Sequence, residues 1–314
     1  MNDQQADSIF IASNSFGIGW QWFRQGLGVL FSYPGRWLII SMIAILVILL
    51  ATMVGGLIPI LGSLLANWFV VAPLTVGLLF CANYCYQRHS PELSNLFYGF
   101  QDSQRFIRIV WVNLVWTLLF ALFGLLASMV FVGLLNLFEP QIVQDALSAA
   151  QTADANQTRL ATPALDNSAL NHLGLGQWLV LIVVGLVFAL IGLVLHYGQV
   201  FSSYLVGSVD YQAPKTLAAV SAGFTGAWRN LSALLLMAVA MSALLGLFIL
   251  AIVLIGALLS YWQVAVLSAL ATVLLVVAGV LLILLITPWW ACANLAAFRQ
   301  IYPQHGHTTE VLPN

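Results

Sequence analysis

Hydrophobic and polar positions follow one another in this chain as long uncharged stretches separated by short basic segments. No Asp, Glu, Lys or Arg lies in the stretches 37–87, 109–138, 167–209 and 230–298. A membrane-spanning helix needs about 20 apolar residues to cross about 30 Å of hydrocarbon. The first and last stretches are each long enough for two crossings and a turn, and each middle stretch holds one crossing. The pattern therefore predicts an all-α membrane protein with six transmembrane helices.

Composition supports a lipid environment. Hydrophobic residues make up 62% of the chain and charged residues 6%, whereas soluble domains carry about 25% charged residues. The net charge of −1 gives no reason to expect a nucleic-acid partner. The partners that we expect are membrane lipids, with a protein partner or a second copy of the chain as further candidates.

The distribution of basic residues predicts the orientation of the chain. If the N-terminus is cytoplasmic, six crossings place every Lys and Arg except Arg159 on the cytoplasmic side: Arg24, Arg36, Arg88, Arg105, Arg108, Lys215, Arg229 and Arg299. Such an excess follows the positive-inside rule, so we expect a bacterial inner-membrane protein with both termini in the cytoplasm. The opening residues 1–15 lack the basic region and cleavage site of a signal peptide, so the first helix is expected to be retained.

A short pattern recurs three times in front of the uncharged stretches. A Phe is followed five positions later by an Arg at Phe31–Arg36, Phe100–Arg105 and Phe224–Arg229. Repetition of this kind indicates a repeated architecture. We expect three hairpins, each preceded by an interfacial amphipathic helix. The predicted segments are 16–91, 92–210 with an extracytoplasmic loop at 139–177, and 211–303, between disordered ends at 1–15 and 304–314.

Local patterns add three structural expectations. In the segment 16–31, Phe16, Trp20, Phe23, Leu27, Leu30 and Phe31 recur at helical spacing and predict an aromatic face on a surface helix. Pro73 should kink the second span. Glycines in the third and fourth spans predict close helix packing there, and they are Gly124, Gly133, Gly185, Gly192 and Gly198.

Several of these segments resemble a known group of proteins. The run Leu96-Phe97-Tyr98-Gly99-Phe100, the run Trp228-Arg229-Asn230 and the ending from Pro288 to Tyr302 are similar to bacterial six-helix inner-membrane families of unknown function. These families in turn resemble the membrane domain found beside some glycerophosphodiester phosphodiesterases. The resemblance implies an integral membrane protein and no catalytic residues, and the soluble phosphodiesterase domain has no counterpart in this chain.

Two constellations could carry chemistry, and each has a structural alternative. Cys81, Cys85 and His89 follow helical spacing, and together with Cys292 they could offer four ligands to zinc. The alternative is that the cysteines are small packing residues. His196 is the one ionisable side chain deep in a predicted span, and with Gln199, Asn67 and Asn113 it could line a polar cavity. The alternative is a neutral His196 that is hydrogen-bonded to a Gln or Asn of another helix, which we favour because the spans contain no Asp or Glu.

Arg36, Arg105 and Arg229 could bind phosphate headgroups of lipids, with Trp37, Phe106 and Trp228 beside the acyl chains. The alternative is that these arginines only anchor helix ends at the cytoplasmic side.

The functional expectation is a non-enzymatic protein that handles lipids or the envelope, with no cofactor. No Walker loop, Ser-His-Asp set or His-Glu-x-x-His motif occurs in the sequence. A secondary transporter of a small uncharged or apolar solute and a membrane scaffold that docks a partner protein are the alternatives.

The predicted orientation can be tested with a reporter fused after Tyr302. We expect the reporter to be found in the cytoplasm because the basic segments hold both termini there. A reporter exposed outside the inner membrane would contradict the layout.

Overall fold

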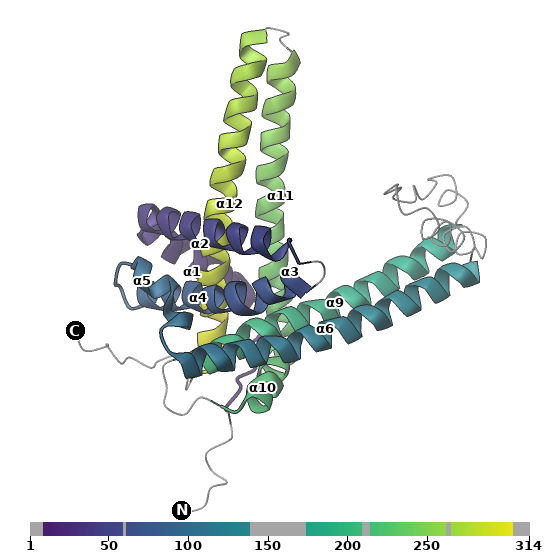
Figure 1. The fold of residues 1–314 in the computed structure, drawn as a ribbon. Coiled ribbons are helices and arrows are strands. Elements are labelled where there is room, and N and C mark those ends of the chain that lie inside the picture. Colours follow the sequence, from purple (N-terminus) through teal and green to yellow (C-terminus); the bar gives the residue numbers. More distant parts are fainter. Residues whose placement is uncertain (1–8, 59–60, 139–173, 209–213, 262–264, 304–314) are drawn as a thin grey trace, which may run out of the picture. The chain divides into compact units, whose positions relative to one another are not determined.

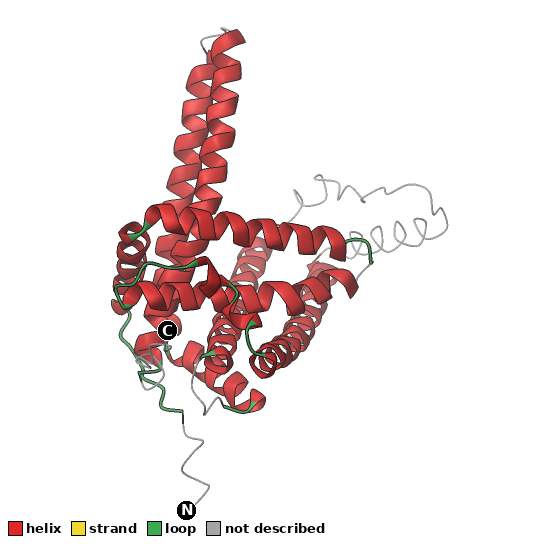
Figure 2. Cartoon of the chain, turned by 60° about the vertical axis from the view of Figure 1, so that its left-hand side comes forward, coloured by secondary structure: helices red, strands yellow, loops and turns green. Residues whose placement is uncertain are grey.

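The described residues of the computed structural model, 9–58, 61–138, 174–208, 214–261 and 265–303, are almost entirely helical and include no strand (Figures 1 and 2). Within these ranges, six helical segments are long and apolar enough to cross a membrane. They are α2 (Pro34–Gly55), the continuous run of α3 (Leu61–Ala66), η1 (Asn67–Val71) and α4 (Ala72–Tyr86), α6 (Ser103–Phe138), α9 (Leu175–Gly207), α11 (Leu231–Tyr261) and α12 (Ala265–Ile301). The predicted number of spanning helices is therefore confirmed for this part of the chain.

Shorter elements precede three of the spans, as the sequence pattern predicted, but the middle one differs in form. Helices α1 (Ile18–Ser32) and α10 (Thr216–Arg229) are continuous. Residues 92–102 form only a single turn, α5 (Leu93–Leu96), and a short 3-10 helix, η2 (Tyr98–Phe100). Asp102 starts the next helix, because its carboxylate accepts a hydrogen bond from the backbone N–H of Gln104 at 3.1 Å. The expectation of one amphipathic helix here was wrong.

The predicted irregularity at Pro73 takes the form of a π-helix. Because proline has no N–H, Pro73 cannot donate to the carbonyl four residues earlier. The backbone N–H of Ala72 bonds to the carbonyl of Asn67, which is the wider spacing of a π-helix. Pro288 lies inside α12, which continues through it as one helix.

Contacts divide the chain into two compact units, residues 1–116 with 196–314, and residues 117–195. The first unit contains the large side chains that are almost fully buried: Trp22, Trp37, Trp116, Phe201, Phe298 and Tyr302. Burial raises the pKa of the Tyr302 phenol, which donates a hydrogen bond to the carbonyl of Ala222 at 2.8 Å. These aromatic residues come from α1, α2, α6, α9 and the end of α12, and they belong to the buried core of this unit.

The second unit pairs the remaining parts of α6 and α9, which lie side by side (Figure 1). The rings of Phe123 and Phe188 are 5.5 Å apart between their centroids. A Cβ added at Gly124, Gly133 or Gly185 would find no described atom within 4 Å. The expectation that these glycines mark close packing was therefore wrong, because the pair touches through larger side chains.

The described part of the N-terminal segment is held by hydrogen bonds. The backbone N–H of Ala12 donates to the carbonyl of Ile301 at 2.9 Å. The side-chain oxygen of Asn230 accepts from the backbone of Asn14 at 2.8 Å, and its amide donates to the carbonyl of Ala12 at 2.9 Å. The expected disorder of residues 1–15 is thus wrong for residues 12–14. Residues 139–173 of the predicted loop and the predicted tail 304–314 lie outside the described residues, and the loop prediction was wrong for residues 175–177, which begin α9.

The face of α1 that its hydrophobic spacing predicted is only partly buried in the protein, since Phe23 and Leu30 of that face are buried. Phe16, Trp20 and Phe31 are exposed, whereas Trp22 is fully buried. Gly19 and Gly26 determine which side of α1 packs against the spanning helices, because each of them lies directly against the backbone of such a helix. A Cβ at Gly26 would lie 2.8 Å from the backbone nitrogen of Ala293 in α12, and one at Gly19 would overlap Ala233 in α11.

A glycine-to-alanine substitution, which adds one methyl group, tests the close contact between Gly77 of α4 and Leu96 of α5. In Gly77→Ala, the new Cβ would lie 2.6 Å from the carbonyl carbon of Leu96. We expect this overpacking to lower stability by about 1–3 kcal/mol, measured as unfolding in detergent. Gly28→Ala is the matched control, since nothing lies within 4 Å of a Cβ there, and alanine favours a helix over glycine. Equal stability of both variants would contradict the contact.

Candidate functional site: an apolar cavity beside α1

Two of the three interfacial segments are packed tightly on a spanning helix through the glycine that directly precedes the Phe of the repeated pattern. A Cβ at Gly99 of η2 would lie 2.5 Å from the carbonyl oxygen of Pro73 in α4. A Cβ at Gly223 of α10 would overlap Gly198 and Ser202 in α9. Both glycines immediately precede the Phe of the repeated pattern. At these two places there is no room for a cavity between segment and span.

The first segment carries a leucine at the same place in the pattern. Leu30 precedes Phe31 in α1, where the other two copies have glycine. The close approach of α1 to α12 occurs one turn earlier, at Gly26. Beyond that contact the helices separate, and a cavity of ≈ 440 Å³ opens between α1, α11 and α12. This volume lies in the range of about 300–1,000 Å³ that is typical of ligand pockets.

The lining of this cavity is apolar on every side. It consists of Leu27, Leu30, Phe31, Leu244, Leu245, Phe248, Ala251, Ile255, Ala278, Leu281, Leu282, Leu285, Ile286 and Trp289. The indole N–H of Trp289 is the only polar side-chain group among these residues. The Trp289 ring packs edge-on against Phe23 at 5.1 Å between centroids, and its side chain is buried. Such a lining offers contact to hydrocarbon and almost no hydrogen bonds.

Two alanines provide much of the space, and the sequence analysis did not single them out. Ala251 of α11 and Ala278 of α12 line the cavity among Leu, Ile and Phe side chains. An alanine side chain ends at Cβ, so facing alanines leave room that two leucines would fill. The feature of the sequence that indicates this cavity is Leu30, which stands where the other two copies of the repeated pattern have glycine.

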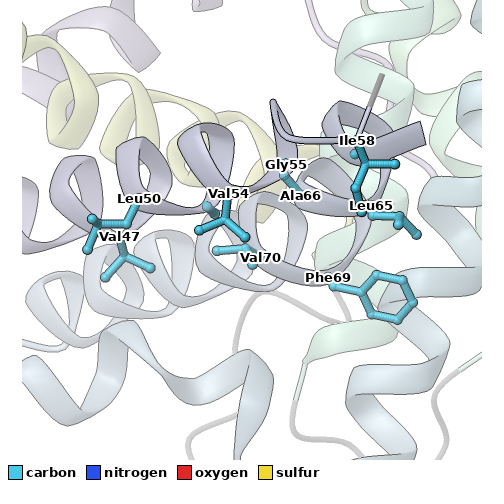
Figure 3. Close-up of a pocket in the computed structure, with 11 residues that line it drawn as sticks. Val47, Leu50, Val54, Gly55, Ile58, Leu65, Ala66, Phe69 and Val70 are labelled. Carbon is cyan, nitrogen blue, oxygen red and sulfur yellow. The ribbon is translucent and has the colours of Figure 1, made fainter. Parts of the chain in front are cut away.

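A second apolar groove, of ≈ 490 Å³, runs between α2 and the α3–η1 segment (Figure 3). Gly55 and Gly62 hold the two helices together at one end, since a Cβ at Gly55 would lie 2.5 Å from the Gly62 carbonyl oxygen. Val54 is 65% exposed and Phe69 is 43% exposed. This groove has two helical walls, whereas the cavity beside α1 has three.

The polar residues predicted to share a cavity are only partly brought together. The Gln199 amide donates to the Asn113 side-chain oxygen at 2.8 Å, and the Asn113 amide donates to the Ser203 hydroxyl at 3.1 Å. Asn67 lies in η1, on another helix of the same unit. Asn113 and Gln199 therefore form a hydrogen-bond pair between α6 and α9, and the expected partnership of His196 with such an amide stays a prediction.

His196 lies apart from that pair. Its ring is exposed and stands 6.1 Å from the ring of Trp290, between centroids, and 5.5 Å from that of Tyr197. The imidazole thus lies beside α12.

The structure does not assemble the predicted zinc ligands. Cys81, Cys85 and Cys292 are buried free cysteines, and the ring of His89 lies 5.1 Å from the ring of Tyr84. Among the described residues, no group of three or more His, Cys, Asp or Glu side chains could hold a metal ion. The cysteines pack at the crossing of α4 and α12, in agreement with the packing alternative.

The three arginines of the repeated pattern have different surroundings. Arg36 and Arg229 are exposed at the start of α2 and at the end of α10. Arg105 is half-buried, donates to the carbonyl of Tyr98 at 3.1 Å and lies 3.9 Å from the centroid of the Tyr98 ring. Arg105 thus holds η2 against α6, and headgroup binding stays a prediction for Arg36 and Arg229.

No protein-family model, no curated protein and no solved structure matches this chain. The candidate function therefore rests on the geometry of the cavity between α1, α11 and α12.

Removal of the amide at position 113 tests the hydrogen-bond pair. In Asn113→Leu, the Gln199 amide loses its acceptor, and we expect stability in detergent to fall by about 1 kcal/mol, as for other hydrogen bonds between membrane helices. The double variant Asn113→Leu/Gln199→Leu should recover part of this loss because no donor is left unsatisfied. Strictly additive losses would contradict the pairing.

Proposed function

We propose that this chain is a non-enzymatic, multi-pass protein of the bacterial inner membrane that binds the acyl chain of a lipid. The observation that carries the proposal is the ≈ 440 Å³ cavity between α1, α11 and α12, with its hydrocarbon lining. An empty apolar void forfeits dispersion contacts along all its walls. A lipid chain restores them without burying any polar group.

The position of the cavity supports access from the bilayer. Side chains of α11 and α12 next to the cavity are exposed on the outer surface, among them Leu247, Val253 and Ile283. In a membrane protein, such a surface faces lipid tails. A chain from the surrounding bilayer can therefore enter from the side without passing through water.

We also propose that the chain consists of three related hairpins. Each interfacial segment lies against the second span of another hairpin: α1 against α12, η2 against α4, and α10 against α9. This shared mode of contact supports three related hairpins. The excess of Lys and Arg on one predicted side supports the inner membrane and cytoplasmic termini.

One observation favours a secondary transporter as the second candidate. The span Leu61–Tyr86 is interrupted by a π-helix directly before Pro73, and Asn67 begins that π-helix. Broken spans near the midplane are typical of transporter binding sites. Protection of a cysteine introduced at position 67 by a transported solute would favour this function over lipid binding.

Filling the cavity tests the proposed function. In Ala251→Phe and Ala278→Phe, an aromatic ring would occupy the space of the chain. We expect cross-linking of a photoreactive phospholipid, with a diazirine in its acyl chain, to α11 and α12 to fall at least fivefold, because rings and chain exclude one another. Peptide mass spectrometry of the purified protein in nanodiscs measures the yield.

Ala121→Phe is the matched control, because Ala121 is exposed on α6 and does not line the cavity. Its yield should equal that of the unchanged protein. Unchanged labelling of α11 and α12 in both cavity variants would contradict the proposal.

A further inference from the structure

A second cavity adjoins the first one across α11 and α12. It has a volume of ≈ 340 Å³ and is lined by Met241, Ser242, Leu245, Ile286, Thr287 and Trp290. Leu245 and Ile286 line both cavities. Only these two side chains are shared, so they form the partition between the two spaces.

The two cavities differ in chemistry. The second one contains the hydroxyls of Ser242 and Thr287 and the indole of Trp290, whereas the first one contains almost only hydrocarbon. The Thr287 hydroxyl donates to the carbonyl of Ile283 at 3.2 Å, so its remaining role towards a ligand is that of an acceptor. The His196 ring, 6.1 Å from Trp290, adds an imidazole beside this cavity.

The two cavities also differ in depth along the helices. Residues 241 and 242 are closer to the start of α11 at Leu231 than any α11 residue of the first cavity. Trp290 is closer to the end of α12 at Ile301 than any α12 residue of the first cavity. The polar space therefore lies towards the ends of the hairpin that carry Arg229 and Arg299, and the apolar space lies deeper. This is the order of head and tail in one leaflet of a bilayer.

We infer that the two cavities together bind one lipid with an uncharged head that forms hydrogen bonds, such as a diacylglycerol. The inference rests on the proposed function, because the chain of this lipid is the one in the first cavity. Its hydroxyl and ester groups meet Ser242, Thr287 and Trp290, beside His196. The molecule passes between α11 and α12 at Leu245 and Ile286.

The absence of formal charge in the lining selects the head group. None of the six lining residues is Lys, Arg, Asp or Glu. Among the residues that the structure describes, His196 is the one titratable residue with an aromatic ring contact to them. A phosphate taken out of water needs a cation or several strong donors to offset the loss of hydration. An ester or a hydroxyl needs only one or two hydrogen bonds, which this lining can supply.

The test uses the full chain in nanodiscs and a diacylglycerol with a diazirine in one acyl chain. The probe should label the α11 and α12 peptides, and unlabelled diacylglycerol should compete at least tenfold better than phosphatidylglycerol. The double variant Ser242→Val/Thr287→Val should weaken labelling about tenfold, since two neutral hydrogen bonds are lost. The control Ser232→Val, at an exposed position of α11 outside both cavities, should leave labelling unchanged.

The outcomes distinguish the acyl-chain site in the first cavity from the uncharged head group in the second. Labelling that phosphatidylglycerol prevents equally well, and that the double variant retains, would overturn the uncharged head while keeping the acyl-chain site. No labelling of α11 and α12 by either the phospholipid or the diacylglycerol probe would overturn both. Competition on the unchanged protein decides the question even if the double variant does not fold.

Discussion

Close backbone contact between interfacial segments and spanning helices is the constraint on which this structure depends. A membrane offers little hydrophobic driving force between helices, so packing at short range has to hold them together. Gly77, Gly99 and Gly223 allow such packing at positions where a Cβ would overlap a neighbouring backbone or side chain. The buried aromatic core grows around these contacts, and the more exposed parts of the hairpins extend from it into lipid.

The candidate site lies beside the first copy of the repeated pattern, in which the close glycine contact with a spanning helix is displaced by one turn. With Leu30 in the place of glycine, α1 touches α12 one turn earlier, at Gly26. The space that remains is lined by hydrocarbon, and the small residues Ala251 and Ala278 enlarge it. A departure from the repeated sequence pattern at Leu30 therefore accompanies the cavity between α1, α11 and α12.

Sequence reasoning predicted the parts that depend on composition and charge. Charge-free stretches predicted six spanning helices, and Pro73 predicted an irregular second span. The missed features depend on three-dimensional neighbours. Aromatic spacing predicted a helical face in α1 but not its contacts with α11 and α12, because Gly19 and Gly26 make those contacts and a hydrophobic pattern does not count glycine.

At the candidate site, too, the features that depend on three-dimensional neighbours could not be predicted from the sequence. The scarcity of polar groups in the spans indicated hydrogen bonding between helices, but it singled out His196, whereas the observed pair is Asn113 with Gln199. The cavity was not predicted, because an alanine among leucines looks like ordinary apolar sequence until the opposite helix is known. Arg105 looked equivalent to Arg36 and Arg229, yet its contact with Tyr98 gives it a structural role that spacing alone does not reveal.

The most direct measurement is an experimental density map of the protein in a lipid nanodisc. If glycine contacts close two segments and Leu30 keeps the third open, continuous density of an acyl chain should lie between Leu27, Ala251 and Ala278. A map in which α1 closes onto α11 and α12, with those three side chains in contact and no chain between them, would contradict the account.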